Sequence, residues 1–115
     1  MKVLSMRFCS TEADCDPTIA FFEKLGLPTL EMPAEAAAFP GKIFTAGESW
    51  LEFWKEGPGM EKGIMLQIIV DDAEAFVKQA KDNGLDAQGP MEMHGERVYF
   101  FKTPSGMPVS VNQKL

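Results

Sequence analysis

The chain is organised around one stretch, Ser49-Trp50-Leu51-Glu52-Phe53-Trp54. Aromatic and apolar residues crowd this stretch and turn-forming residues bound it, so it is predicted to be a β-strand. Alternate side chains of a strand share a face, which places the two tryptophans and the glutamate on one side and the leucine and phenylalanine on the other. Because a carboxylate is seldom buried alone, Glu52 is expected to face solvent, an opposite charge, a ligand or a metal.

The bulk composition fits one globular unit and excludes several classes of partner. A chain of 115 residues with 45% hydrophobic content can bury a core. Its formal net charge of −6 disfavours nucleic acid and anionic membrane surfaces as partners. It has no apolar run of the roughly 20 residues that a membrane helix needs. A signal peptide is not expected, because polar residues follow the start of the sequence after only a short apolar stretch. With only Cys9 and Cys15, it is expected to keep reduced thiols in the cytoplasm.

The first half of the chain is predicted to run strand, helix and three strands. The first strand covers residues 3–9, and a polar loop follows over residues 10–15. Asp16 and Pro17 are typical of a helix start, and Gly26 is typical of a helix end. A short strand is expected over residues 27–32, a loop or poor helix over residues 33–40, and strands over residues 42–46 and 50–54.

The second half repeats this order after a glycine-rich linker over residues 56–63. A strand is predicted over residues 64–70. Asp71 and Glu74 then have the spacing of a capping box, and Asn83-Gly84 ends the second helix. Short strands over residues 85–88, 97–102 and 109–112 are expected, with a loop over residues 89–95. The repeat, residues 1–55 and 64–115, predicts an α+β fold in which each module has a sheet with a helix on one face.

The chain resembles the vicinal oxygen chelate superfamily, which includes glyoxalase I, extradiol dioxygenases and bleomycin-resistance proteins. The resemblance covers essentially the whole chain. It implies two βαβββ modules that form an open U-shaped barrel around a cleft, and commonly a homodimer. Three stretches carry it: Asp14…Ala20-Phe21-Phe22…Leu25-Gly26-Leu27, Ile68-Ile69-Val70-Asp71-Asp72, and Tyr99-Phe100-Phe101-Lys102-Thr103-Pro104-Ser105-Gly106.

The resemblance also implies where a metal would be held. Enzymes of the superfamily place His and Glu ligands on the first and last strand of each module, at positions that here carry Arg7, Glu52, Met65 and Ser110. Arginine donates only, a thioether is soft and a serine hydroxyl is a weak ligand. Neither a metal nor a cofactor is therefore predicted. Arg7 is expected either to pair with Glu52 in an abandoned metal site or to share with it the anchoring of a ligand.

Further side chains are expected to line the cleft from the alternation of the strands and the family register. The indoles either stack on a ligand or fill the cleft or a dimer interface. A thiol beside Arg7 would be reactive if the arginine lowered its pKa, and inert if buried. His94, the only histidine, is expected in a solvated turn. The lining residues are Cys9, Trp50, Trp54, Met65, Gln67, Val98 and Phe100.

The leading functional hypothesis is metal-independent binding of a small aromatic or charged molecule in the cleft, in the manner of the bleomycin-resistance branch. One alternative is a lyase, isomerase or transferase with an atypical metal site or a metal-free site, in which Glu52 is the catalytic base. Another is a degenerate structural dimer without a small ligand. If Arg7 pairs with Glu52, a flat and nearly neutral ligand is favoured; if Arg7 turns away, a cation is favoured.

Overall fold

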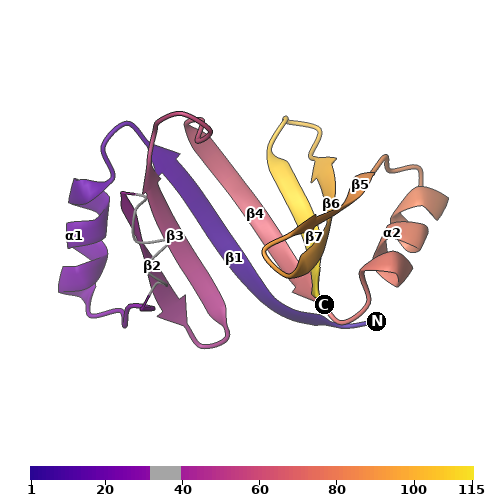
Figure 1. Ribbon diagram of the computed structural model, residues 1–115, viewed down its shortest axis with the longest axis horizontal. Helices are drawn as coiled ribbons and strands as arrows, with labels where there is room; N and C mark the ends of the chain where they lie inside the picture. The colour runs from indigo at the N-terminus through magenta and orange to yellow at the C-terminus, as the bar shows by residue number, and fades with distance from the viewer. Residues whose placement is uncertain (32–39) are drawn as a thin grey trace. The chain divides into compact units, whose positions relative to one another are not determined.

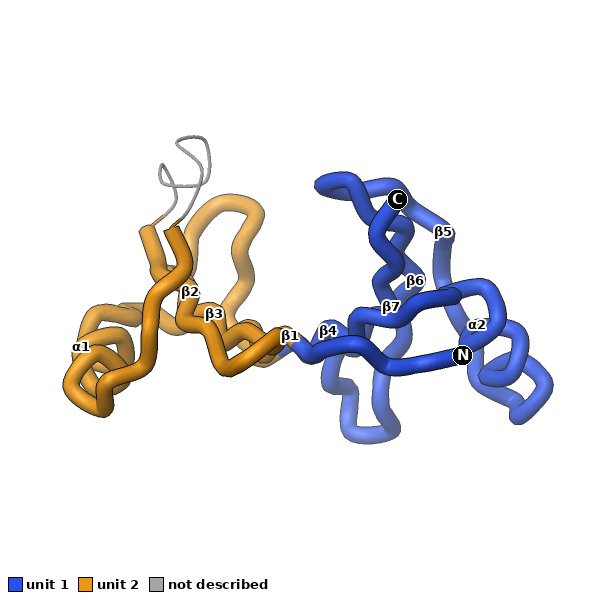
Figure 2. Tube along the Cα trace, turned by 90° about the horizontal axis from the view of Figure 1, so that it is seen from below, with its two compact units in different colours: residues 1–6, 65–115 blue, residues 7–64 orange. Residues whose placement is uncertain are grey.

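The computed structural model describes residues 1–31 and 40–115, where the chain forms two helices and seven strands (Figure 1). The fold divides into two compact units (Figure 2). Unit 1 comprises Met1–Met6 and Met65–Leu115, and unit 2 comprises Arg7–Ile64. The loop or poor helix that was predicted over residues 33–40 falls almost wholly outside the described residues.

Unit 2 is a three-stranded sheet with one helix on one face. Strand β3 (Ser49–Lys55) lies in the middle, antiparallel to β2 (Gly41–Ala46) and parallel to β1 (Val3–Glu12), which belongs to this unit from Arg7 on. Helix α1 (Asp16–Leu25) packs on the sheet through Ile19 and Phe22 (Figure 1). The alternation predicted for β3 is confirmed on this side of the sheet, because Leu51 and Phe53 both contact the core beneath α1.

Aromatic rings make up much of the core of unit 2. Phe44 and Phe53 are almost completely buried. Phe22 of α1 stacks on Phe53 with 4.9 Å between ring centroids and tilts against Phe44 at 5.9 Å. Pairs at these separations add about 0.5–1.5 kcal/mol each beyond the burial of their apolar area. This cluster therefore determines which face of β3 is turned towards the helix.

Unit 1 is a four-stranded sheet with the second helix on one face. Its strand order is β4 (Gly63–Val70), β7 (Pro108–Lys114), β6 (Glu96–Lys102) and β5 (Gln88–Met93), and β4 and β7 are parallel. Helix α2 (Ala73–Asp82) buries Ala73 and Val77. These two residues pack on a core that also contains the buried side chains of Val70, Tyr99 and Val111.

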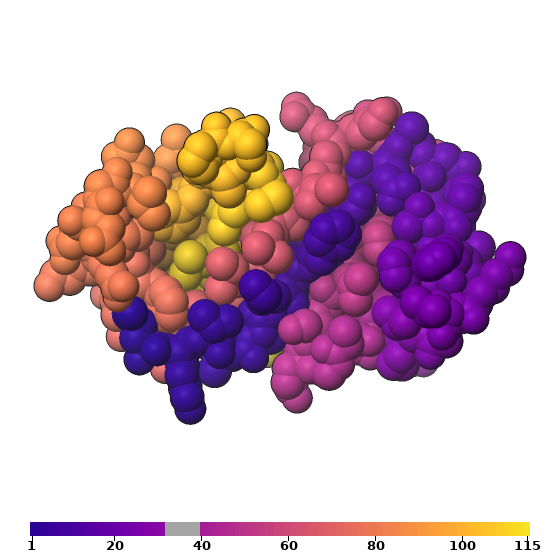
Figure 3. Space-filling view, turned by 180° about the vertical axis from the view of Figure 1, so that it is seen from behind, coloured from indigo at the N-terminus to yellow at the C-terminus, as the bar shows by residue number. Residues whose placement is uncertain are grey.

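Helix α2 begins one residue later than the sequence pattern indicated. Asp72, not Asp71, is the N-cap, and its Oδ1 accepts a hydrogen bond of 3.1 Å from the backbone N–H of Ala75. Asp71 instead accepts a 2.7 Å hydrogen bond from the backbone N–H of Lys2. Figure 3 shows the N-terminal residues at the surface beside this turn. The predicted cap of α1 is also one residue off, since Cys15 occupies the N-cap position and Asp16 is the first helical residue.

Three other predicted elements differ from the structure. Strand β1 continues to Glu12 through polar residues predicted to form a loop, because they pair with the end of β3. Residues 27–31 form only one isolated bridge, Thr29 to Phe44, so the strand predicted over residues 27–32 is wrong. The loop expected over residues 89–95 is mostly strand β5, which replaces the short strand expected over residues 85–88.

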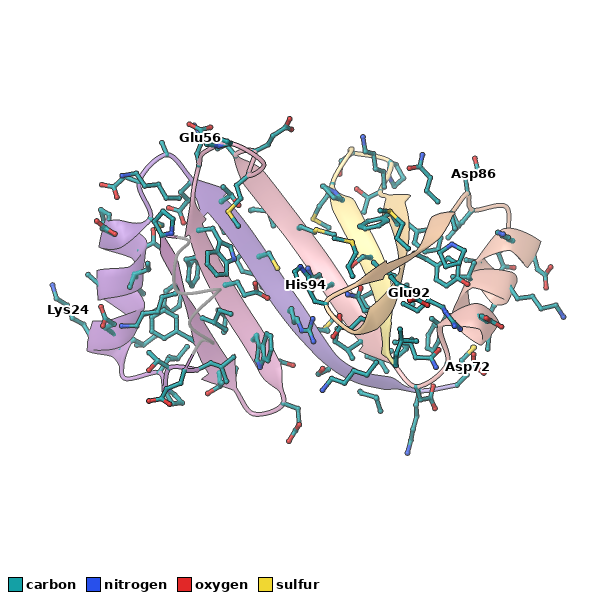
Figure 4. The ribbon with its side chains drawn as sticks, viewed as in Figure 1. Lys24, Glu56, Asp72, Asp86, Glu92 and His94 are labelled. Atoms are coloured by element: carbon teal, nitrogen blue, oxygen red, sulfur yellow. The ribbon has the colours of Figure 1, made fainter. Side chains whose placement is uncertain are left out.

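The turn between β5 and β6 carries the single histidine. His94 and Gly95 have φ angles of 51° and 74°, as a two-residue type I′ hairpin turn requires. His94 is exposed in this turn, which confirms the expectation of a solvated loop residue (Figure 4). His94 is therefore a residue of the hairpin turn in unit 1.

The α+β fold class is confirmed. In each unit the sheet ends in an edge strand, β2 or β5, that has no further strand beside it within the described ranges, so the sheet is open. The U-shaped barrel around a cleft concerns the placement of one unit against the other and stays a prediction. Neither of the helices in the described part of the chain is long and apolar enough to cross a membrane.

The capping assignment predicts the effect of one substitution. Asp72→Ala removes the acceptor for the Ala75 N–H and should lower the free energy of unfolding by about 1 kcal/mol. Asp86→Ala is the matched control, because Asp86 is exposed in the loop after α2 (Figure 4) and should change stability by under about 0.5 kcal/mol. Urea unfolding of both variants measures the difference. Equal stabilities would contradict the assignment of Asp72 as the cap.

Candidate functional site

The face of unit 2 opposite α1 carries five of the residues that the sequence predicts for the binding site. Trp50, Glu52 and Trp54 project from β3 on this face, as the sequence predicted, and all three are partly buried. Strand β1 runs alongside, with Arg7 in register with Trp50 and Cys9 in register with Glu52. Five residues predicted for the site therefore lie on two neighbouring strands of one sheet.

The Glu52 carboxylate has two hydrogen-bond donors within the unit. The indole N–H of Trp54 donates to Oε1 of Glu52 at 3.2 Å, and the thiol of Cys9 donates to the same carboxylate. The predicted ion pair between Arg7 and Glu52 stays a prediction. Strand register brings the two residues near each other, as expected.

Arg7 lies over the indole ring of Trp50. Its guanidinium carbon is 4.5 Å from the ring centroid, within the range of a cation–π interaction. Such a contact contributes roughly 0.5–1 kcal/mol at an exposed site and more where water is excluded. One of the two indoles is therefore engaged with a cation of the protein itself, whereas the other donates to Glu52.

Cys9 is not an activated nucleophile in this arrangement. Burial is the main cause that raises the pKa of the Cys9 thiol far above its ordinary value, and the negative charge of Glu52 and the hydrogen bond to it raise it further. The positive charge of Arg7 acts in the opposite direction but does not prevail. Because the thiolate is the reactive form, Cys9 should be inert near neutral pH. Of the two alternatives left open by the sequence, the structure supports the inert thiol.

The face of unit 1 opposite α2 holds a buried row of hydrogen-bonded side chains. The hydroxyl of Ser110 donates to Oδ1 of Asn112 at 2.6 Å, and Nδ2 of Asn112 donates to Oε1 of Glu96 at 2.9 Å. All three residues are at most 8% exposed. Because each buried polar group that loses its partner costs about 1–3 kcal/mol, this row is expected to be sensitive to substitution.

The remaining predicted site residues surround this row. Gln67 of β4 and Phe100 of β6 are both in register with Ser110, and Val98 is in register with Asn112. Met65 lies two residues before Gln67 on the same strand and is partly buried, as Gln67 and Phe100 are. The predicted residues thus form two sets, one in each unit, and their meeting across one cleft stays a prediction.

Sequence reasoning missed three residues of these faces. Glu96 and Asn112 were not selected, although Asn112 alternates with Ser110 in a strand and so had to share its face. Gly41 of β2, which the sequence pattern does not single out, lies beneath the indole of Trp54. The sequence gives no indication that Gly41 contacts Trp54, because this contact depends on where the tryptophan side chain lies.

The side chains at the four ligand positions that the resemblance implies do not fit a divalent metal. Ser110 is fully buried and gives its hydroxyl proton to Asn112. Arg7 has no lone pair to offer, and the thioether of Met65 is soft, which leaves Glu52 as the single hard ligand where catalytic sites usually have about three. Within the described ranges, no group of three His, Cys, Asp or Glu residues is arranged to hold a metal ion.

Comparison with solved structures establishes the class of fold. A superfamily member from Vibrio splendidus 12B01, described as glyoxalase/bleomycin resistance protein/dioxygenase, is 16% identical, with a TM-score of 0.63 over 98% of this chain and 100% of that one. Methylmalonyl-CoA epimerase from Mycobacterium tuberculosis is 13% identical, with a TM-score of 0.66 over 98% of this chain and 87% of that one. The fold is therefore that of the vicinal oxygen chelate superfamily, as the sequence motifs indicated.

The similarity extends to a protein of different description. NAD-dependent benzaldehyde dehydrogenase from Legionella pneumophila is 14% identical, with a TM-score of 0.67 over 96% of this chain and 99% of that one. No protein-family model matches the sequence, and a search of curated proteins found no match. At these identities the solved structures share a fold with the chain, and its activity has to be argued from its own side chains.

The environment of Cys9 predicts a pH-dependent reaction. The Glu52 charge raises the pKa of the Cys9 thiol, so Glu52→Gln should lower that pKa, increase the thiolate fraction at any given pH and speed alkylation by iodoacetamide. Glu48→Gln, an equal loss of charge in the exposed turn after β2, should leave the rate unchanged. Mass spectrometry after cleavage beyond Glu12 measures Cys9 separately from Cys15. Equal Cys9 rates in the two variants would contradict the Glu52 contact.

Proposed function

We propose that the protein binds a small, flat, positively charged molecule on the face of unit 2 that carries Trp50, Glu52 and Trp54, without the help of a metal. The observation that carries this proposal is the contact set of Glu52. Its carboxylate is contacted by Trp54 and Cys9, two neutral donors that bring no positive charge of their own. A carboxylate beside aromatic side chains is suited to a planar cation, which can both stack and pair.

The contacts of Glu52 favour a cation over a neutral ligand. The guanidinium of Arg7 lies over Trp50, and the donors described for Glu52, from Trp54 and Cys9, are neutral. The formal net charge of −6 should also attract cations and speed their encounter with the protein. A carboxylate has about four lone-pair sites, so two donors leave Glu52 able to accept from a ligand.

The structure gives the alternative functions less support. A lyase, isomerase or transferase would need a reacting group, and the most nucleophilic candidate on this face, Cys9, is held as a neutral thiol. Glu52 as a general base would need a substrate proton within hydrogen-bond reach. The homodimer, the structural dimer without a ligand and the cytoplasmic location stay predictions.

Tryptophan fluorescence tests the proposal directly, because the two tryptophans of the chain both lie on this face. Titration with N-methylquinolinium, a planar cation, should change the emission, whereas quinoline, which has the same rings and is neutral at neutral pH, should bind more weakly. Glu52→Gln should weaken binding of the cation about tenfold, equivalent to about 1.4 kcal/mol. It should leave the affinity for quinoline nearly unchanged, since quinoline carries no charge to lose.

The matched control is again Glu48→Gln, which removes the same charge from an exposed turn. It separates a local contact with Glu52 from a general effect of net charge. Equal affinities of wild type and Glu52→Gln for the cation, or an emission that does not respond to either compound, would contradict the proposed function.

A further inference from the structure

The carboxylate of Glu52 is held in one direction by the residues around it. Trp54 lies two residues further along β3, on the same face, and its indole N–H donates to Oε1. Cys9 approaches from the neighbouring strand, where it is in register with Glu52. Two donors from two strands restrict the carboxylate more than a single contact would, because rotating it would break one of the two bonds.

The indole of Trp54 can lie where it does because residue 41 has no side chain. Gly41 of β2 is in register with Trp54. A Cβ added at Gly41 would overlap Cε3 of the indole, would lie 2.9 Å from Cζ3 and would also lie 2.5 Å from the backbone oxygen of Phe53, closer than such atoms approach. Any other residue at this position would therefore have to displace the ring and strain the pairing of β2 with β3. The absence of a side chain at one position of β2 thus leaves room for the indole that carries a donor on β3.

We propose that Gly41 and Trp54 are positioning residues that make Glu52 a directional acceptor, so that the site prefers planar cations that carry an N–H donor over planar cations that do not. This inference rests on the proposed function and adds the class of ligand to it. A carboxylate held in one orientation binds more tightly a ligand whose charged N–H points along one of its free lone pairs. A carboxylate that swings freely attracts positive charge of either kind about equally.

The first test needs no ligand. If Trp54 holds Glu52 against Cys9, Trp54→Phe should release the carboxylate, lower the pKa of the Cys9 thiol and speed its alkylation several-fold at a given pH. Cys15, at the N-cap of α1, is 1% exposed and serves as an internal reference, because its rate should rise only if the whole unit loosens. Gly41→Ala should act in the same direction, since its Cβ meets the same indole, but its Cβ also meets the backbone oxygen of Phe53, so Trp54→Phe is the deciding variant.

The second test compares two probes by calorimetry, which does not depend on the indoles. Protonated 4-aminoquinoline offers N–H donors, and N-methylquinolinium has the same charge and ring system without them. The wild type should bind the first about tenfold more tightly, as expected for one charge-assisted hydrogen bond. In Trp54→Phe this ratio should fall towards one, even though the phenyl ring keeps an aromatic surface. Loss of stacking alone would weaken both probes and leave the ratio unchanged.

The two tests separate the inference from the function on which it rests. If neither probe binds to the wild type, the proposed function is wrong, and the preference for N–H donors falls with it. If both probes bind but Trp54→Phe changes neither the Cys9 rate nor the ratio of affinities, the binding function stands and the positioning role is overturned. A rise in the rates of Cys9 and Cys15 together would also overturn it, because it would show general loosening.

Discussion

The period of two in strand β3 is the constraint on which the rest of unit 2 depends. Phe53 must lie beneath α1, where it stacks on Phe22 and is 3% exposed. The residues on either side of it then have to lie on the opposite face. A shift of β3 by one residue would turn Glu52 towards the aromatic core and Phe53 towards the opposite face. Burying the charge of Glu52 in that core would cost several kcal/mol. The packing of one ring thus fixes the position of the carboxylate that the proposed function uses.

The same constraint produces different chemistry in the two units. In unit 1, Val111 of β7 faces α2, so its neighbours Ser110 and Asn112 share the other face and bond to each other there. That face is closed by hydrogen bonds among buried side chains. The corresponding face of unit 2 is partly buried and combines indoles with a carboxylate that can accept further donors. This contrast is why the proposed ligand is assigned to unit 2.

The sequence predicted what alternation and composition determine, and it failed where side-chain directions or distant pairings decide. The faces of β3 followed from the period of two, and the superfamily motifs gave the fold. Asp71 looked like a helix cap, but its bond to Lys2 depends on a contact 69 residues apart in sequence. Strand register placed Arg7 near Glu52, yet register does not fix a long side chain, and the guanidinium packs on Trp50.

The hydrogen bond from the indole N–H of Trp54 to the carboxylate of Glu52 is the contact on which the proposed site depends. The spectrum of backbone and indole N–H groups by nuclear magnetic resonance tests it most directly, since two tryptophans give only two indole signals. The account predicts that Glu52→Gln moves the Trp54 indole proton clearly upfield, because a bond to a carboxylate is stronger than one to an amide, and moves the Trp50 signal less. A Trp54 signal that stays in place in Glu52→Gln would contradict the account.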